Sequence, residues 1–327
     1  MNITLDNVPR AGSGVRWILR LGDAYRGFLA LFLRIIGPDA AYALMAALAR
    51  CFYRLADPLR NRCEAQCRAA LGGRYNDRAI RRIAEQAFVH RTWNLADLLL
   101  APRYLHARTY RRYGGEFPEP YLGLLQRAQR ERRPVILLTA YLGPYDLLPL
   151  FLGFNGIRAV AIYRRHANPS FDAYRQFVRS RGGCEMVPVE EAVERLPHVL
   201  EKGGTVAMLS DHHAARRGIQ HLFLGLPTVA SPAVALLAER YDAIVAVASI
   251  LRSSSQFRFE IRVADFFGSE TWRSQTKPAA FITERYSAAL ERLILANPTQ
   301  YLWAHTRWGT EFADRLTGAS RPDKSGV

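Results

Sequence analysis

Hydrophobic and polar positions follow a helical spacing in the first third of the chain. From residue 38 to about residue 100, apolar residues recur every three or four positions, which is typical of amphipathic helices. Gly72 and Gly73 interrupt this pattern, and Asn76 or Asp77 can cap the helix that follows them. We therefore predict a helical N-terminal part.

After Gly114 and Gly115 the pattern changes to short β-rich runs that alternate with helical ones. The predicted strands are residues 135–139, 157–163, 205–209 and 244–251. The predicted helices are residues 146–153, 169–181, 189–202 and 232–240. In residues 257–263 every second residue is apolar or aromatic, as in an antiparallel edge strand. The alternation predicts an α/β fold with a mostly parallel sheet flanked by helices.

These patterns divide the chain into four parts. They are an N-terminal segment with an interfacial helix (1–37), a helical subdomain (38–115), an α/β domain (116–316) and a short polar tail (317–327) that we expect to be disordered. The apolar stretches 27–33 and 40–49 are too short to span a bilayer. Their flanking aromatic and arginine residues favour a membrane-associating element that lies in the interface; a pair of core helices in a soluble domain is the alternative.

Composition adds a strong positive charge. The 45 lysines and arginines exceed the 29 acidic residues by 16, and such a surface attracts acidic proteins, anionic lipid, nucleic acid or phosphorylated substrates. No recognised nucleic-acid-binding motif is present, so we expect no nucleic acid partner. The four cysteines lack the spacing of a disulfide framework or a zinc site. We expect no metal site and a location that faces the reducing cytosol.

Polar clusters follow three of the predicted strands. In open α/β sheets ligands bind where strands end and helices begin. The first cluster contains Tyr141 and Asp146, with Gly143 in the turn between them. The second begins at Tyr163 and Arg164. The third contains Asp211, His212, His213 and Arg216.

The order of these clusters resembles the bacterial lysophospholipid acyltransferase superfamily, and within it the lipid A secondary acyltransferases. The resemblance covers residues 38–310. It rests on the segment 138–147 (LTAYLGPYDL), on Tyr163-Arg164 with Asn168-Pro169, on 209–213 (LSDHH) with Arg216-Arg217-Gly218, on 223–227 (FLGLP) and on 301–308 (YLWAHTRW).

The resemblance implies an acyltransferase at the cytoplasmic face of the bacterial inner membrane. A hydroxyl or amine of a lipid-like acceptor would attack an acyl thioester on acyl carrier protein or coenzyme A, with no other cofactor. Its partners would be that carrier or CoA thioester and anionic membrane lipid. Tyr141, Asp146 and Asp211 match the catalytic positions. The residues expected to bind substrate are Gly143, Arg164, His212, His213, Arg216 and Gly225.

Position 141 departs from the family pattern, which has a histidine there as general base. A tyrosine has a pKa near 10 and needs a downward shift of roughly three units to act as a base at pH 7. A nearby arginine such as Arg164 lowers a phenol's pKa, whereas burial raises it. Three possibilities follow: Tyr141 is an unusual base or proton donor, His212 or His213 replaces it, or the chain is an inactive or repurposed relative that binds acyl chains or carrier protein.

Overall fold

A six-stranded sheet forms the centre of the structure, a computed structural model that describes residues 27–214, 218–305, 307–309, 312 and 316. In the described chain the sheet strands are β1 (Val135–Thr139), β2 (Ala159–Tyr163), β3 (Glu185–Pro188), β4 (Thr205–Leu209), β7 (Ile244–Arg252) and β8 (Phe259–Phe267). They are arranged in the order β3-β2-β4-β1-β7-β8. A separate hairpin is formed by β5 (Ile219–Phe223) and β6 (Leu226–Ala230).

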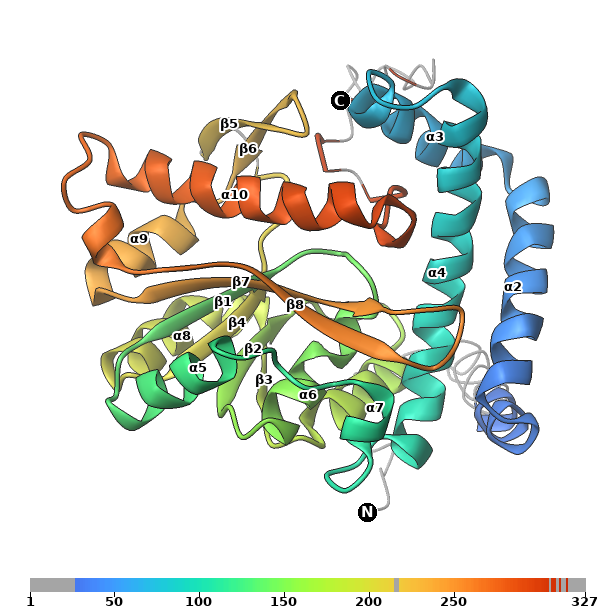
Figure 1. The fold of residues 1–327 in the computed structure, drawn as a ribbon, viewed down its shortest axis with the longest axis horizontal. Coiled ribbons are helices and arrows are strands. Elements are labelled where there is room, and N and C mark those ends of the chain that lie inside the picture. Colours follow the sequence, from blue (N-terminus) through green and yellow to red (C-terminus); the bar gives the residue numbers. More distant parts are fainter. Residues whose placement is uncertain (1–26, 215–217, 306, 310–311, 313–315, 317–327) are drawn as a thin grey trace, which may run out of the picture.

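The helices surround this sheet (Figure 1). Their bounds are α2 (Pro38–Leu55), α3 (Asp57–Leu71), α4 (Asp77–Tyr104), α5 (Tyr121–Arg130), α6 (Leu148–Phe154), α7 (Pro169–Ser180), α8 (Ala192–Glu201), α9 (Ala233–Tyr241) and α10 (Pro278–Ala296). Residues 27–36 are also helical.

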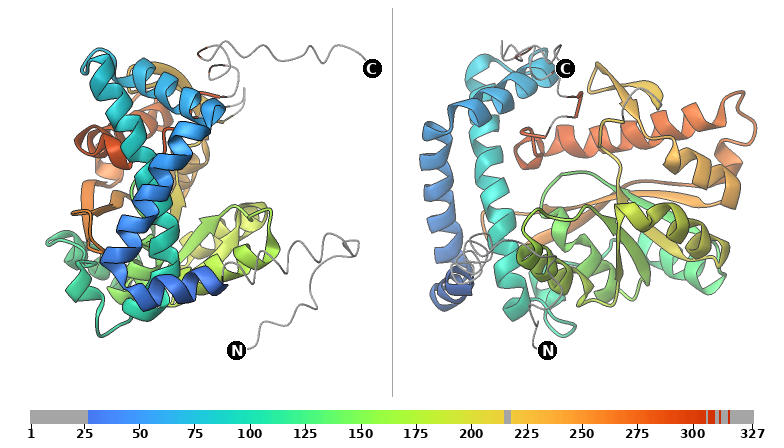
Figure 2. Two further views of the ribbon diagram at one scale, coloured as in Figure 1. Left: turned by 90° about the vertical axis from the view of Figure 1, so that its right-hand side faces the viewer. Right: turned by 180° about the vertical axis from the view of Figure 1, so that it is seen from behind.

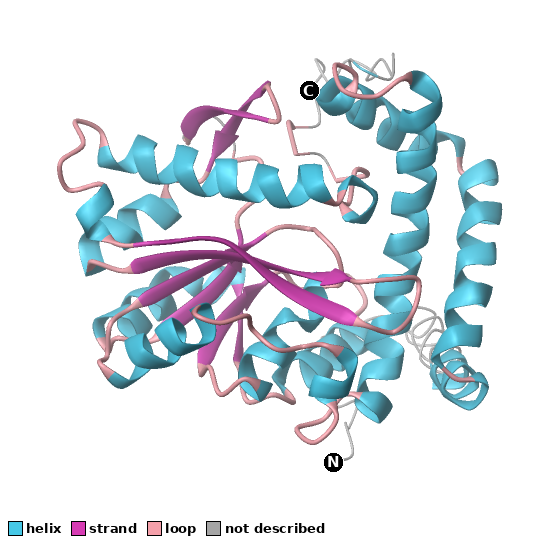
Figure 3. Cartoon of the chain, in the orientation of Figure 1, coloured by secondary structure: helices cyan, strands magenta, loops and turns pink. Residues whose placement is uncertain are grey.

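All neighbouring strands of the sheet run parallel except β7 and β8, which are antiparallel. Side chains alternate between two cores, because successive residues of a strand point to opposite faces. Val135 and Leu137 of β1 join the core that contains α5, α6 and α7, whereas Ile136 and Leu138 join the core that contains α8, α9 and α10. Figure 3 shows the resulting layers of helix, sheet and helix. The predicted α/β fold with a mostly parallel sheet is confirmed.

The predicted elements can be compared directly with the observed ones. The strands expected at 135–139 and 205–209 have the observed bounds, and the edge strand expected at 257–263 is β8, displaced by two residues at its start. The helix expected from residue 146 begins only at Leu148, because Tyr145–Leu147 forms a 3-10 turn. The elements that were not predicted are β3, the β5–β6 hairpin, α5 and α10. The predictions made for residues 1–26 and for the tail 317–327 concern residues outside the described part of the chain.

The N-terminal helices α2 and α4 lie side by side along one end of the sheet (Figures 1 and 2). Asn76 caps α4, as the sequence predicts, by accepting the Ala79 N–H at 2.9 Å. Helix α4 is tied to β7 by a fully buried ion pair between Asp97 and Arg252. Breaking such a pair by removing one partner costs about 3–5 kcal/mol, because it leaves a buried charge without compensation. This pair fixes the helices relative to the strand ends.

Large apolar side chains are exposed on the first two helices. Phe28, Leu31 and Ile35 are 68%, 58% and 71% exposed on the helix at residues 27–36. Their spacing of three and four positions places them on one face. None of the helices in the described part of the chain has the length and hydrophobicity that a bilayer-spanning segment requires.

Candidate active site

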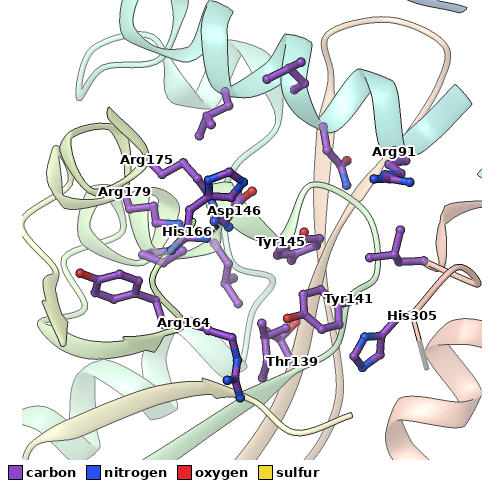
Figure 4. A pocket seen from close by; sticks show the side chains of 18 of the residues that line it. Arg91, Thr139, Tyr141, Tyr145, Asp146, Arg164, His166, Arg175, Arg179 and His305 are labelled. Atoms are coloured by element: carbon purple, nitrogen blue, oxygen red, sulfur yellow. Dashed lines mark hydrogen bonds and ion pairs between the residues drawn. The ribbon is translucent and has the colours of Figure 1, made fainter. Parts of the chain in front are cut away.

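A cavity of about 770 Å³ lies between the N-terminal helices and the carboxyl ends of β1, β2 and β4 (Figure 4). The helices contribute a mostly apolar wall that includes Phe52, Leu59, Phe88, Leu95 and Leu98. The strand ends contribute a polar wall that includes Tyr141, Asp146, Arg164 and His305. The first two predicted clusters therefore meet in one cavity that can hold a molecule with both a hydrocarbon part and a polar part.

The turn after β1 is held by the segment that follows α10. The Leu302 N–H donates to the Tyr141 carbonyl at 2.9 Å, and the Gly143 N–H donates to the Gln300 carbonyl at 3.0 Å. Gly143 has φ +62°, and a Cβ at this position would lie 2.1 Å from the Ile250 carbonyl oxygen. Only glycine fits this backbone path without a shift of β7. Gly143 thus shapes the turn, and its expected contact with substrate remains a prediction.

Tyr141, from the first cluster, contacts two residues of the third cluster. Its backbone N–H donates to Asp211 Oδ2 at 3.0 Å, and its phenol oxygen lies 3.1 Å from His212 Nε2. The His305 ring packs against it with centroids 4.7 Å apart. Asp211 is fully buried, so its carboxylate fixes the turn from beneath the cavity wall.

The surroundings of Tyr141 keep its phenol protonated. Burial, together with the carboxylates of Asp211 and Asp146, raises the pKa of Tyr141 to about 12, and the charges of Arg175 and Arg164 offset this only in part. With such a pKa, roughly one phenol in 10⁵ is ionised at pH 7. The contribution of Arg164 that the sequence suggested is present, but burial outweighs it.

Asp146 lies in the 3-10 turn after β1 and is almost completely buried. Its Oδ1 accepts hydrogen bonds from Arg175, at 2.9 Å, and from Arg179. Burial by itself would raise the pKa of Asp146, but the charges of Arg179 and Arg175 outweigh it and hold that pKa below its usual range. The Asp146 carboxylate therefore stays ionised and orients Arg175 and Arg179 at the cavity wall. The hydrogen-bond partner of the Tyr141 phenol is His212 and not Asp146.

Arg164 is one of the exposed arginines that line this cavity. It lines the cavity and has no ion-pair partner among the residues that the structure describes, whereas its neighbour Arg165 pairs with Glu191 at 2.9 Å. An exposed guanidinium at a cavity mouth can bind a phosphate or carboxylate through two parallel hydrogen bonds. Arg164 is thus free to bind an anionic group.

The remaining predicted residues lie away from the cavity. His213 Nδ1 is 3.4 Å from the Thr228 hydroxyl, on the side of the β5–β6 hairpin. Gly225 has φ +78° at the turn of this hairpin, where a Cβ would meet no atom within 4 Å. Neither residue lines the cavity. Arg216 lies outside the described residues.

Three site residues were missed from the sequence. Arg175 and Arg179 stand one helical turn apart on α7, so both can face Asp146. This i, i+4 arginine pair in a helix that starts at a predicted ligand-binding strand end was the signal that could have revealed them. His305 stands in the segment 301–308 on which the resemblance rests, but its contact with Tyr141 depends on the pairing of residues 300–302 with the turn after β1.

Comparison with known proteins identifies the family of the chain. A model of the bacterial lipid A biosynthesis acyltransferase family matches residues 19–310. No curated protein sequence matches the chain significantly. The family match includes the helices, all strands of the sheet and every described residue of the cavity wall. The chain belongs to the bacterial lipid A biosynthesis acyltransferase family.

Proposed function

We propose that the chain transfers a long-chain acyl group from the thioester of acyl carrier protein or coenzyme A to a hydroxyl or amine of a lipid-like acceptor. Membership in the family implies acyl transfer to a lipid acceptor. The observation that carries the finer proposal is the two-sided cavity, in which apolar side chains of α3 and α4 face the polar groups at the ends of β1 and β2.

In the proposed reaction the acceptor oxygen or nitrogen attacks the thioester carbonyl. A C–O or C–N bond forms, the C–S bond breaks, and the proton lost by the acceptor is transferred to the departing thiolate. Leu95 and Leu98 offer apolar surface for the acyl chain. Arg164 offers a positive charge for an anionic group of the donor or acceptor. Asp146 holds Arg175 and Arg179 in place beside the polar wall.

The surface supports a location at the membrane. The apolar stripe, which we define as Phe28, Leu31 and Ile35, is exposed on the helix at residues 27–36. On α2, Leu48, Phe52 and Leu55 are also exposed, and Phe52 lines the cavity as well. We infer that these residues bind the cytoplasmic face of the inner membrane and that the net charge of +16 attracts anionic lipid and an acidic carrier protein.

The test is incubation of the protein with acyl carrier protein or coenzyme A loaded with acyl chains of different lengths, with and without lipid acceptors, followed by mass spectrometry. We expect consumption of thioester and an acylated lipid product. Arg164→Gln should lower kcat/KM about tenfold, which corresponds to roughly 1.4 kcal/mol. The matched control is Arg258→Gln, at an exposed arginine outside the cavity. Binding of thioester without any consumption would instead identify a non-catalytic relative.

A further inference from the structure

The proposed reaction needs a group that takes the proton from the acceptor, and Tyr141 alone is a poor one. Its buried phenol stays protonated far above neutral pH. A general base must lie within hydrogen-bond distance, about 2.6–3.2 Å between heavy atoms, of the atom whose proton it receives. His212 Nε2 satisfies this distance toward the Tyr141 phenol oxygen, at 3.1 Å.

Hydrogen bonds to the backbone fix both residues of this contact, Tyr141 and His212. The Asp211 carboxylate accepts the backbone N–H of Tyr141 at 3.0 Å. The loop that carries His212 is fixed by Arg307, whose Nη1 donates to the His212 carbonyl at 2.8 Å. Arg307 is itself buried and lies over the Phe223 ring at 4.4 Å. The contact between phenol and imidazole is therefore part of a fixed framework that joins β1, the loop after β4 and the C-terminal segment.

We propose that Tyr141 and His212 together replace the single histidine base as a two-residue proton relay, which rests on the acyl transfer proposed above. The acceptor O–H gives its proton to the Tyr141 phenol oxygen while the phenol gives its own proton to His212 Nε2, the imidazole carrying its other proton on Nδ1. The new C–O bond forms at the thioester carbonyl. The same two transfers in reverse deliver the proton to the thiolate as the C–S bond breaks.

This arrangement removes the need for a free phenolate, because the tyrosine gains a proton as it loses one. The group that becomes charged is the imidazole, a side chain that can both accept and return a proton. His305 completes the cluster, with ring centroids 4.7 Å from Tyr141 and 5.4 Å from His212. We assign it a positioning role as the ring that packs against both members of the relay.

The relay is tested with Tyr141→Phe, His212→Gln and the double variant. General base catalysis typically contributes 10²–10⁴-fold, so each single change should lower kcat by about 100-fold or more at little change in KM. Because the two residues act as one unit, the double variant should lose no more than about threefold beyond either single variant. The control is His198→Gln on the exposed face of α8, which should keep the parent's rate.

Each alternative has its own outcome. A His212→Gln enzyme with the parent's kcat overturns the relay, and a large loss in His305→Gln without one in His212→Gln makes His305 the base. The relay is also overturned if the fold-loss of kcat in the double variant equals the product of the two single losses. A parent that consumes no thioester overturns the proposed function, and the catalytic relay with it.

A second measurement does not depend on turnover. In protein labelled with ¹⁵N-histidine, Tyr141→Phe keeps the ring and removes the hydroxyl, so the Nε2 resonance of His212 should move while those of distant histidines stay. A resonance that does not move contradicts the hydrogen bond on which the relay depends.

Discussion

At the scale of single residues, Gly143 shows how closely the site depends on one backbone position. Its positive φ turns the chain after β1 so that Tyr141 faces the cavity and Asp146 enters the 3-10 turn. The turn approaches β7 so closely that no Cβ fits against the Ile250 carbonyl. The chemistry of Tyr141 therefore depends on a residue that has no side chain.

Gly143→Ala should destabilise the protein by about 2–4 kcal/mol, because it combines a strained backbone conformation with a backbone clash. Gly225→Ala is the matched control: it has a similar positive φ of +78° but open space around the new methyl group. It should cost only about 1 kcal/mol. Urea unfolding measures both values, and equal costs would contradict the importance of the close approach to β7.

At the scale of elements, the junction between α4 and β7 positions the apolar wall of the cavity. Arg252 at the end of β7 pairs with Asp97 of α4, and its Nη1 lies 3.2 Å from His90 Nδ1 on the same helix. Tyr42 of α2 joins the pair, since its hydroxyl bonds to Asp97 and accepts the Arg252 Nε–H at 3.3 Å. Three elements are thus linked by one buried polar network.

This network makes the junction sensitive to acid through His90. Burial, and then the charge of Arg252, lowers the pKa of His90 from 6.5 to about 3. The folded protein keeps this histidine neutral, while the unfolded chain binds a proton below about pH 6.5. The stability contributed by neutral His90 is therefore present above pH 6.5 and is lost as the pH falls toward 3. At about 1.4 kcal/mol for each pKa unit, the loss is on the order of 5 kcal/mol.

His90→Gln retains an acceptor for Arg252 but cannot be protonated. The free energy of unfolding of this variant, measured between pH 3 and 9, should fall less steeply below pH 6.5 than that of the parent. Above pH 7.5 the two curves should run parallel, which serves as the internal control. Parallel curves down to pH 3 would show that His90 does not resist protonation in the folded state.

At the scale of the whole molecule, the exposed apolar side chains of the helix at residues 27–36 and of α2 lie at the same end of the sheet as the cavity. The helix at residues 27–36 and α2 lie outside α4, and Phe52 of α2 belongs both to the exposed surface and to the cavity wall. Phe52 therefore connects this exposed apolar surface with the cavity that contains Tyr141.

Replacing the apolar stripe by serine (Phe28→Ser, Leu31→Ser and Ile35→Ser) should weaken binding to vesicles that contain anionic lipid by on the order of 10- to 100-fold, because apolar area buried in the bilayer interface is lost. Co-sedimentation with the vesicles measures this. The control is Val193→Ser with Leu236→Ser, at residues on α8 and α9 that are 82% and 57% exposed. Equal binding of both variants would exclude the stripe as the membrane-binding surface.

The sequence by itself determined those features that depend on neighbouring residues. Apolar residues that alternate along a strand, or recur every three or four positions along a helix, show which face of that element is buried. For this reason β1, β4 and most helices could be predicted within a few residues. Polar residues at strand ends predicted one shared site, because parallel strands bring their carboxyl ends to the same edge. The strand β3 was missed because it has only four residues and an exposed start.

Only the tertiary structure decided how the site can work. The partners of Asp146 come from α7, and His305 reaches Tyr141 through the backbone pairing of Leu142 with Tyr301, far apart in the sequence. The protonation of Tyr141 depends on the balance between burial and nearby charges, and that balance exists only once the chain is folded. A sequence pattern names the residue at position 141, whereas its proton affinity is a property of everything packed around it.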